Sequence, residues 1–131
     1  MAAGRGQTVM SVTGGRELRR RLRTIEGGLA DLKAAHAWVA DYVGGIAARD
    51  APRRTGRLAG TGRDSGTKTM SVVRFGRGAS VPYAGPVHYG WPARHIAPNP
   101  WVINAAQRSE GVWQAYFEGR IEELVERTRG A

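Results

Sequence analysis

Histidines are the side chains of this chain best suited to hold a metal ion or to transfer a proton. His88 and His95 share a stretch rich in Pro and aromatic residues, whereas His36 stands within a helical pattern. A zinc site needs at least three protein ligands, and neither a Cys nor a third ligand lies near the pair. Phosphate-binding glycine loops and nucleophile-elbow motifs are also missing. We therefore predict no metal, no cofactor and no catalysis, with His36 as a half-buried core residue.

Aromatic side chains could instead stack on nucleic-acid bases. Tyr83, Tyr89, Trp91 and Trp101 cluster in one stretch of the chain, and such rings can form a base-stacking platform. Aromatic residues beside prolines also form small cores where a loop folds over a sheet. We favour this second interpretation, a small core.

A block of arginines is the third candidate. The sequence has 20 Lys and Arg against 11 Asp and Glu, a net charge of +9 that would attract DNA or an acidic partner. Glu17 and Glu26 lie near the block, and its arginines fall around a whole helix, which favours a solvated face over a groove-reading one. The candidate contacts to DNA or an acidic partner are Arg16, Arg19, Arg20, Arg21 and Arg23.

Length and composition limit the architecture that must position these residues. A chain of 131 residues is most simply one domain, residues 1–131. The chain has no Cys, so disulfides are excluded. It lacks an apolar run of the ~20 residues that a membrane span requires, and its start has no apolar signal core. We expect no membrane contact and synthesis in the cytoplasm.

Residues 15–50 have a helical pattern. Apolar residues recur at alternating spacings of four and three, which places them on one helix face. Gly27 and Gly28 should kink the helix or divide it in two, with the second helix covering about residues 28–49 before Pro52 stops it. The seam comprises Leu18, Leu22, Ile25, Leu29, Leu32, His36, Val39, Val43 and Ile46. Residues 1–14 are a short edge strand or, as we favour, an arm that is flexible or ordered by a partner.

Residues 55–90 should form a small antiparallel sheet. Residues 67–75 alternate polar and apolar side chains and make the best strand. Residues 58–63 and 83–89 are weaker candidates, separated from it by turns at residues 64–66 and 76–80. Pro86 cannot donate to a ladder, so the last strand should lie at an edge.

The C-terminal part should be a helix over residues 99–128. Asn99 is a plausible N-cap, Pro100 a good first residue, and Gly111 a point where the helix bends. The predicted fold is α+β, with three to four strands packed by a long N-terminal helix and a C-terminal helix.

Short motifs resemble a known family. Residues 52–58 fit a pattern P-x-x-T-G-x-L, Tyr83 and His88 lie in a pattern P-Y-A-x-x-x-H-x-G, and Asn99-Pro100-Trp101 opens the last helix. These motifs are similar to those of the tailed-phage family named for HK-ninety-seven gene product ten, over about residues 14–128. Many members have Gly-Thr after the second motif, where this chain has Trp91-Pro92-Ala93-Arg94.

The resemblance implies a structural protein of the virion neck, of the head–tail connector, tail-completion or tail-terminator type. Such a protein acts without catalysis, as a homo-oligomeric ring that is a hexamer or a dodecamer. Its partners are neck and tail-tube proteins, and it contacts passing genomic DNA non-specifically. The alternative is a basic nucleic-acid-binding protein. An edge strand and a stiff Trp- and Arg-bearing loop suit subunit contacts. The predicted interface residues are Tyr83, Pro86, Tyr89, Trp91, Arg94 and His95.

Overall fold

The computed structural model describes residues 7–11, 15–52, 56–76 and 82–129. It is a mixed helix and strand structure and is mostly helical. Parts of the predicted arm (residues 1–6 and 12–14), of the first motif (53–55) and of the loop at 76–80 (residues 77–80) lie outside the described residues. The elements are β1 (Gln7–Ser11), α1 (Gly15–Leu22), α2 (Gly28–Asp50), η1 (Ala59–Thr61), β2 (Arg63–Gly66), β3 (Met70–Arg74), α3 (Ala84–Tyr89), η2 (Pro92–Arg94), α4 (Trp101–Arg108) and α5 (Glu110–Arg129).

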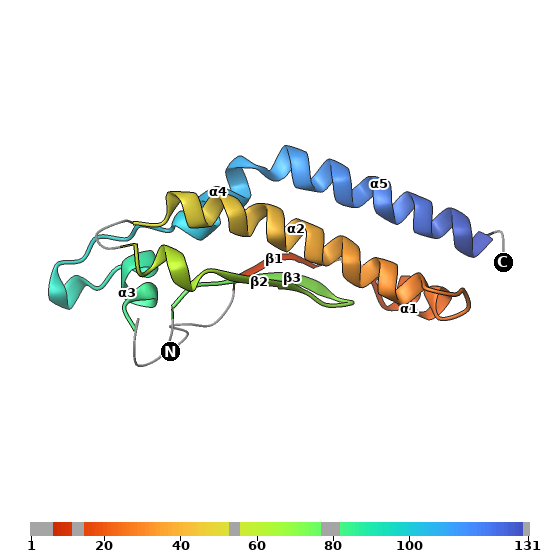
Figure 1. Cartoon of the computed structure of the whole chain (residues 1–131), viewed down its shortest axis with the longest axis horizontal. Helices are drawn as coiled ribbons and strands as arrows, with labels where there is room; N and C mark the ends of the chain where they lie inside the picture. The colour runs from red at the N-terminus through yellow and green to blue at the C-terminus, as the bar shows by residue number, and fades with distance from the viewer. Residues whose placement is uncertain (1–6, 12–14, 53–55, 77–81, 130–131) are drawn as a thin grey trace.

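Helix α2 is the central layer of the molecule. The sheet packs on one of its sides, and α4 and α5 pack on another (Figure 1). Leu32, Val39 and Val43 of the predicted seam are buried, and Ala40 and Ala47 are buried beside them. Because two layers cover the helix, its apolar surface is wider than a single seam. The prediction that this helix packs on the sheet is confirmed.

Gly27 and Gly28 separate α1 from α2, as predicted. Gly27 has a φ of 72°, a left-handed conformation that favours glycine. A Cβ on Gly28 would lie 2.6 Å from the carbonyl oxygen of Leu22, so the two helix ends meet where a larger residue does not fit. The predicted break is therefore enforced by both backbone conformation and close packing.

The sheet has the strand order β1-β3-β2 and is antiparallel. Gly66 of β2 pairs with Ser71 of β3, and both are buried beneath α2. A Cβ on Gly66 would lie 2.1 Å from the backbone nitrogen of Ala37, so β2 approaches α2 at backbone distance. Ser71 donates a hydrogen bond of 2.7 Å to the carbonyl oxygen of His36, which joins β3 to the same turn of α2.

The predicted strand at residues 67–75 is confirmed as β3, but its neighbours in residues 55–90 were wrong. Residues 64–66, predicted as a turn, belong to β2, and η1 (Ala59–Thr61) lies in the middle of residues 58–63. The turn lies instead at residues 67–69, where Thr67 Oγ1 accepts bonds of 3.1 Å from the amides of Thr69 and Met70. Within the described part of residues 55–90, the strands are therefore β2 and β3 rather than three to four. The strand on the other side of β3 is β1, which lies in the segment where we favoured an arm over an edge strand.

The predicted strand at residues 83–89 is a short helix, α3. Pro86 is the third residue of that helix, where an amide would have no intrahelical partner, so its missing N–H costs nothing. Gly90, with a φ of 83°, ends the helix, and its amide bonds to the Pro86 carbonyl at 2.8 Å. The edge strand that we expected at residues 83–89 is therefore wrong. Strand pairing between subunits through these residues is no longer supported.

The C-terminal segment is two helices, α4 and α5, divided at Ser109 rather than bent at Gly111. Pro100, not Asn99, is the N-cap of α4. Helix α5 lies along α2 rather than on the sheet (Figure 1). Arg108, the last residue of α4, pairs with Asp50 at the C-terminal end of α2, and Arg127 of α5 pairs with Asp31 near the N-terminal end of α2 at 2.5 Å. The α4–α5 segment therefore runs antiparallel to α2.

Candidate functional site

Exposed large apolar side chains of the described residues fall on two separate surfaces. Tyr83, Tyr89 and Trp91 are exposed on and beside α3, and we call them, with Arg94 and His95, the α3–η2 surface. Trp38 of α2 and Val112 of α5 are exposed elsewhere, and we call them, with the half-buried Tyr42 and Tyr116, the helix platform. Large exposed apolar surfaces of this kind are typical of interaction sites.

The α3–η2 surface ends in a closed loop over residues 91–96. Trp91 and Ile96 exchange two backbone hydrogen bonds, of 2.8 and 3.1 Å. Inside the loop, the amide of Arg94 bonds to the Trp91 carbonyl at 3.0 Å, and its guanidinium carbon lies 5.3 Å from the Trp91 ring centroid. His95 closes the turn with a φ of 57°. The loop therefore presents a Trp and an Arg stacked on each other in a fixed geometry.

A chain of rings connects this surface to the core. Ring centroids lie 4.5 Å apart for Tyr89 and His88, 5.0 Å for His88 and Trp101, and 5.5 Å for Trp101 and Phe75. Trp101 is buried, whereas Trp91 and Tyr89 are each 44% exposed. The small core that we predicted from the four aromatic residues is thus correct for Trp101 and wrong for the other three.

His88 and Trp101 bring polar atoms into this core without partners. Both ring nitrogens of His88 and Nε1 of Trp101 are buried and have no hydrogen bond. Burial lowers the pKa of His88 below its ordinary value, so the ring is held neutral. Unpaired buried donors and acceptors cost free energy, so the contact between α3 and α4 is less favourable than its burial alone suggests.

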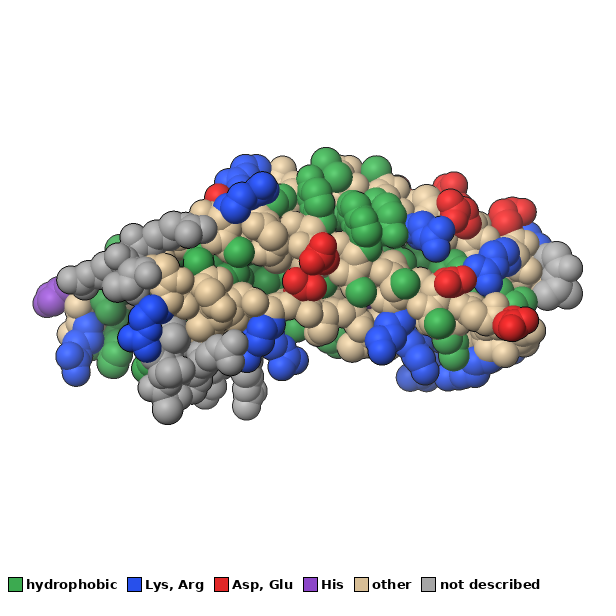
Figure 2. Space-filling view, viewed as in Figure 1, with side chains coloured by type: hydrophobic (Ala, Val, Ile, Leu, Met, Phe, Trp, Pro, Cys, Tyr) green, Lys and Arg blue, Asp and Glu red, His purple; other side chains and the backbone are tan. Residues whose placement is uncertain are grey.

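The helix platform is a stack of three rings from two helices. The Trp38 ring lies 3.7 Å from Tyr116 of α5 and 5.2 Å from Tyr42 of α2, with interplanar angles of 21° and 4°. Figure 2 shows apolar side chains gathered over α5 and α2 near the upper centre of this face. Sequence reasoning missed these residues. The available signal was Trp38 and Tyr42 at a spacing of four, beside the seam rather than on it.

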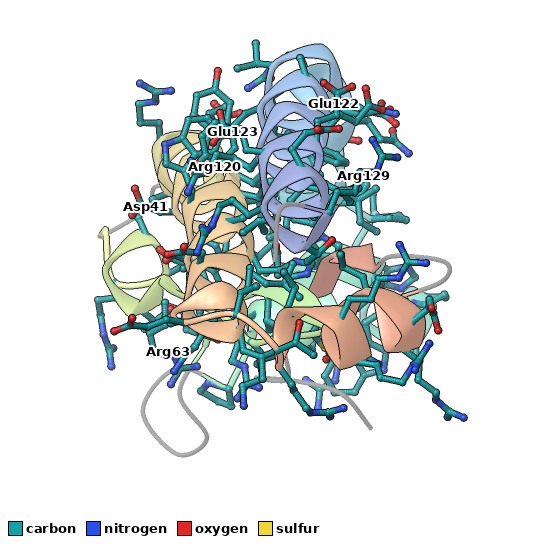
Figure 3. The ribbon with its side chains drawn as sticks, turned by 90° about the vertical axis from the view of Figure 1, so that its right-hand side faces the viewer. Asp41, Arg63, Arg120, Glu122, Glu123 and Arg129 are labelled. Carbon is teal, nitrogen blue, oxygen red and sulfur yellow. The ribbon has the colours of Figure 1, made fainter. Side chains whose placement is uncertain are left out.

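Two carboxylates lie at the edge of the platform. Asp41 lies between Trp38 and Tyr42 on α2, and Asp64 of β2 lies against Gly44, one turn further along that helix. Burial, and then the charge of Asp41, raise the pKa of Asp64. Among the described residues, neither carboxylate has an ion-pair partner. Figure 3 shows Asp41 on the same side of the molecule as Arg120 and Glu123, which pair with each other at 2.6 Å.

The arginine block surrounds α1 as its spacing indicated. Glu17 accepts bonds from Arg20 at 2.8 Å and from Arg21 at 3.2 Å, and the Arg20 hydrogen bond lowers the pKa of Glu17. Arg16 and Arg23 are exposed and make no ion pair with a described residue. Two of the five arginines thus share one local carboxylate, and the others are dispersed around the helix.

Basic residues also lie on the sheet face turned away from α2. Arg63 of β2 is directly opposite Arg74 of β3, and both are exposed. Like charges opposite each other on a sheet are unfavourable. Figure 2 shows Lys and Arg side chains along much of the lower edge of the molecule. This cross-strand pair was absent from our sequence predictions because the turn was placed at residues 64–66.

His36 is a core residue, as predicted, but it is fully rather than half buried. Ser71 uses its single proton on the His36 carbonyl, so the 3.2 Å contact between its oxygen and Nδ1 requires the proton on Nδ1. Burial, with the nearby charge of Arg19, lowers the His36 pKa to about 4. The described residues contain no cluster of three or more His, Cys, Asp or Glu side chains that could bind a metal ion. Among the described helices, none is long and apolar enough to cross a bilayer.

Comparisons with protein-family models, with curated proteins and with solved structures each find no match to this chain. The resemblance to the HK-ninety-seven gene-product-ten family therefore depends on the short motifs alone. Four motif side chains, Leu58, Ala84, His88 and Trp101, are buried, whereas Pro82, Tyr83 and Asn99 are exposed. The four buried side chains support the fold, and Tyr83 is the motif aromatic residue that lies at the surface.

Proposed function

We propose that this protein is a structural subunit of the neck of a tailed bacteriophage, a head–tail connector of the tail-completion or tail-terminator type. Copies would form a ring, a hexamer or a dodecamer, that joins the head to the tail without catalysis. Its partners would be itself and the adjoining neck and tail-tube proteins, and its location the virion.

The observation that carries this proposal is the presence of two exposed aromatic surfaces at different places on one chain. A ring of identical subunits needs two different contact surfaces on each subunit, one for each neighbour. The α3–η2 surface and the helix platform supply two such surfaces, because they lie on separate elements. The phage motifs supply the choice of the virion neck among assemblies of this kind.

Two measurements test the proposal. Mass spectrometry of purified virions should detect the chain in multiple copies per particle, and electron microscopy of particles labelled with an antibody should place it at the head–tail junction. Its absence from intact virions, in a lysate where the chain is expressed, would contradict a structural role.

A basic nucleic-acid-binding protein remains a second candidate, favoured by the exposed Arg63–Arg74 pair. Two like charges held opposite each other are stabilised by a phosphate between them. DNA affinity should then fall with salt at a log–log slope of about −0.9 for each phosphate neutralised. Replacing both residues with Ser should reduce that slope by up to about 2 units. Equal slopes for the variant and the wild type would exclude this pair as a DNA contact.

A further inference from the structure

The two aromatic surfaces carry charges of opposite sign. On the α3–η2 surface, Arg94 lies over the Trp91 ring and has no carboxylate partner among the described residues. At the helix platform, Asp64 lies against Gly44, one turn along α2 from Asp41, and neither carboxylate has an ion-pair partner among the described residues. Burial, and then the charge of Asp41, raise the pKa of Asp64. An arginine from outside the chain would relieve the repulsion between these carboxylates.

The charges of the two surfaces determine which pairs of surfaces can bind each other. A contact between two helix platforms would bring four carboxylates together, and a contact between two loops would bring two Arg94 side chains together. Both arrangements are repulsive, whereas a loop against a platform is complementary. We infer that the loop of residues 91–96 on one copy docks on the helix platform of the next copy, with Arg94 against Asp41 and Asp64 and Trp91 against the stacked rings. This inference rests on the proposed function, because it specifies how the copies of the ring meet.

Both surfaces are already ordered for this contact. The loop is closed by the backbone bonds between Trp91 and Ile96, and the platform rings are stacked on one another. Little side-chain or loop entropy is then lost on docking. Trp, Tyr and Arg are the side chains most enriched among residues that dominate interface energies.

The placement of the two surfaces produces a head-to-tail contact. The α3 and η2 segment forms one end of the elongated molecule, whereas α2 and α5 extend along its body (Figure 1). A copy that docks its end on the body of the next leaves its own platform free for another copy. Such a contact is heterologous, and it closes into a ring when the rotation between copies divides a full turn.

A charge exchange tests this docking. Sedimentation velocity of the purified full chain, over a range of concentrations, should show wild-type self-association. R94D and D41R should each weaken it at least tenfold. A mixture of those two variants should recover association, because the native loop of the D41R copy meets the native platform of the R94D copy, and the two substituted surfaces meet with opposite charges. The double variant, R94D with D41R, should recover most of the wild-type association.

Matched controls make the same charge changes elsewhere. R23D changes an exposed arginine after α1, and E122R changes an exposed glutamate that Figure 3 shows on the side of α5 away from Asp41. Both should associate as the wild type does, and all variants should keep its circular dichroism and melting temperature. Loss of association in R23D but not in R94D would move the basic partner to α1 and overturn the inference.

The outcomes separate this inference from the proposed function. If the wild type associates and the double variant does not recover, the docking geometry is wrong while a ring held by other contacts survives. If the wild type remains monomeric at every concentration, docking between copies is refuted, and the presence of the chain in virions still decides the neck proposal.

Discussion

Replacing Gly66 with Ala tests the contact on which the layer order depends. Gly66 is on β2 and faces α2, and a Cβ there would lie 2.1 Å from Ala37 N, 2.5 Å from Ala37 Cα and 2.6 Å from the His36 carbonyl carbon. All three atoms are backbone of a long helix, so no rotamer change relieves the clash. The backbone of Gly66 does not have a positive φ, so the added methyl acts through space alone.

The size of the effect follows from these distances. Ordinary contact begins at 3.4 Å, so relieving a 2.1 Å approach requires β2 and α2 to separate by 1.3 Å. Overpacking of a core costs about 1–3 kcal/mol, and an opposing backbone that cannot yield places this change at the upper end, about 3 kcal/mol. For a domain of this size, that loss lowers the melting temperature by about 10 °C.

Urea unfolding followed by circular dichroism measures this loss, and Gly45→Ala is its matched control. Gly45 is exposed on α2, and a Cβ there meets nothing within 4 Å. The same Gly-to-Ala change should therefore stabilise the protein by about 0.5–1 kcal/mol, because Ala is the better helix former. If Gly66→Ala unfolds within about 0.5 kcal/mol of the wild type, β2 does not rest against Ala37 and the packing of the hairpin is wrong.

Three further predictions concern the core and its edges. Val39→Asp should cost several kcal/mol, because Val39 is fully buried in the seam, and a melting temperature within a degree of the wild type would remove it from the core. The His36 pKa is about 4 in the fold and its ordinary value is 6.5, so stability should fall by up to about 3 kcal/mol as the pH drops from 6.5 to 4, measured by urea unfolding. His36→Gln should show a flatter profile there, and parallel profiles would contradict the assignment. Arg108→Ala should cost at most about 1 kcal/mol, because its pair with Asp50 is exposed, and a double-mutant cycle measures the coupling; a coupling well above that value would contradict the estimate.

Periodic patterns carried the correct part of the sequence prediction. The spacing of the seam located α2 and the break at Gly27, and the alternation in residues 67–75 located β3. These elements bury one regular face each, so their side chains report the structure directly. The seam did not indicate that α5 would cover a second side of α2, since small residues such as Ala40 and Ala47 are apolar without marking a face.

Local signals failed where backbone conformation depends on tertiary contacts. Pro86 argues against a central strand, but the same residue is acceptable in the first turn of a helix, and residues 83–89 are too few for periodicity to decide. Residues 64–66 have turn composition, yet Gly66 is required in a strand because α2 leaves no room for a side chain. The sequence predicted one of the two candidate surfaces. It identified the residues of the α3–η2 surface but not those of the helix platform.

The position of the platform explains why its residues matter together. Helix α2 is covered by the sheet on one side and by α5 on another, and Trp38, Asp41 and Gly45 follow the strip that remains exposed. A strip open to water is normally polar, and one aromatic residue there needs no special cause. Trp38 is not alone, since Tyr42 and Tyr116 stack on it and two carboxylates, which have no ion pair with any described residue, border it. At one end of the molecule, Trp91 carries Arg94, which has no carboxylate partner in the described part of the chain, so the two surfaces have opposite charges. That complementarity, rather than either surface alone, is the physical reason to expect one copy to bind the next.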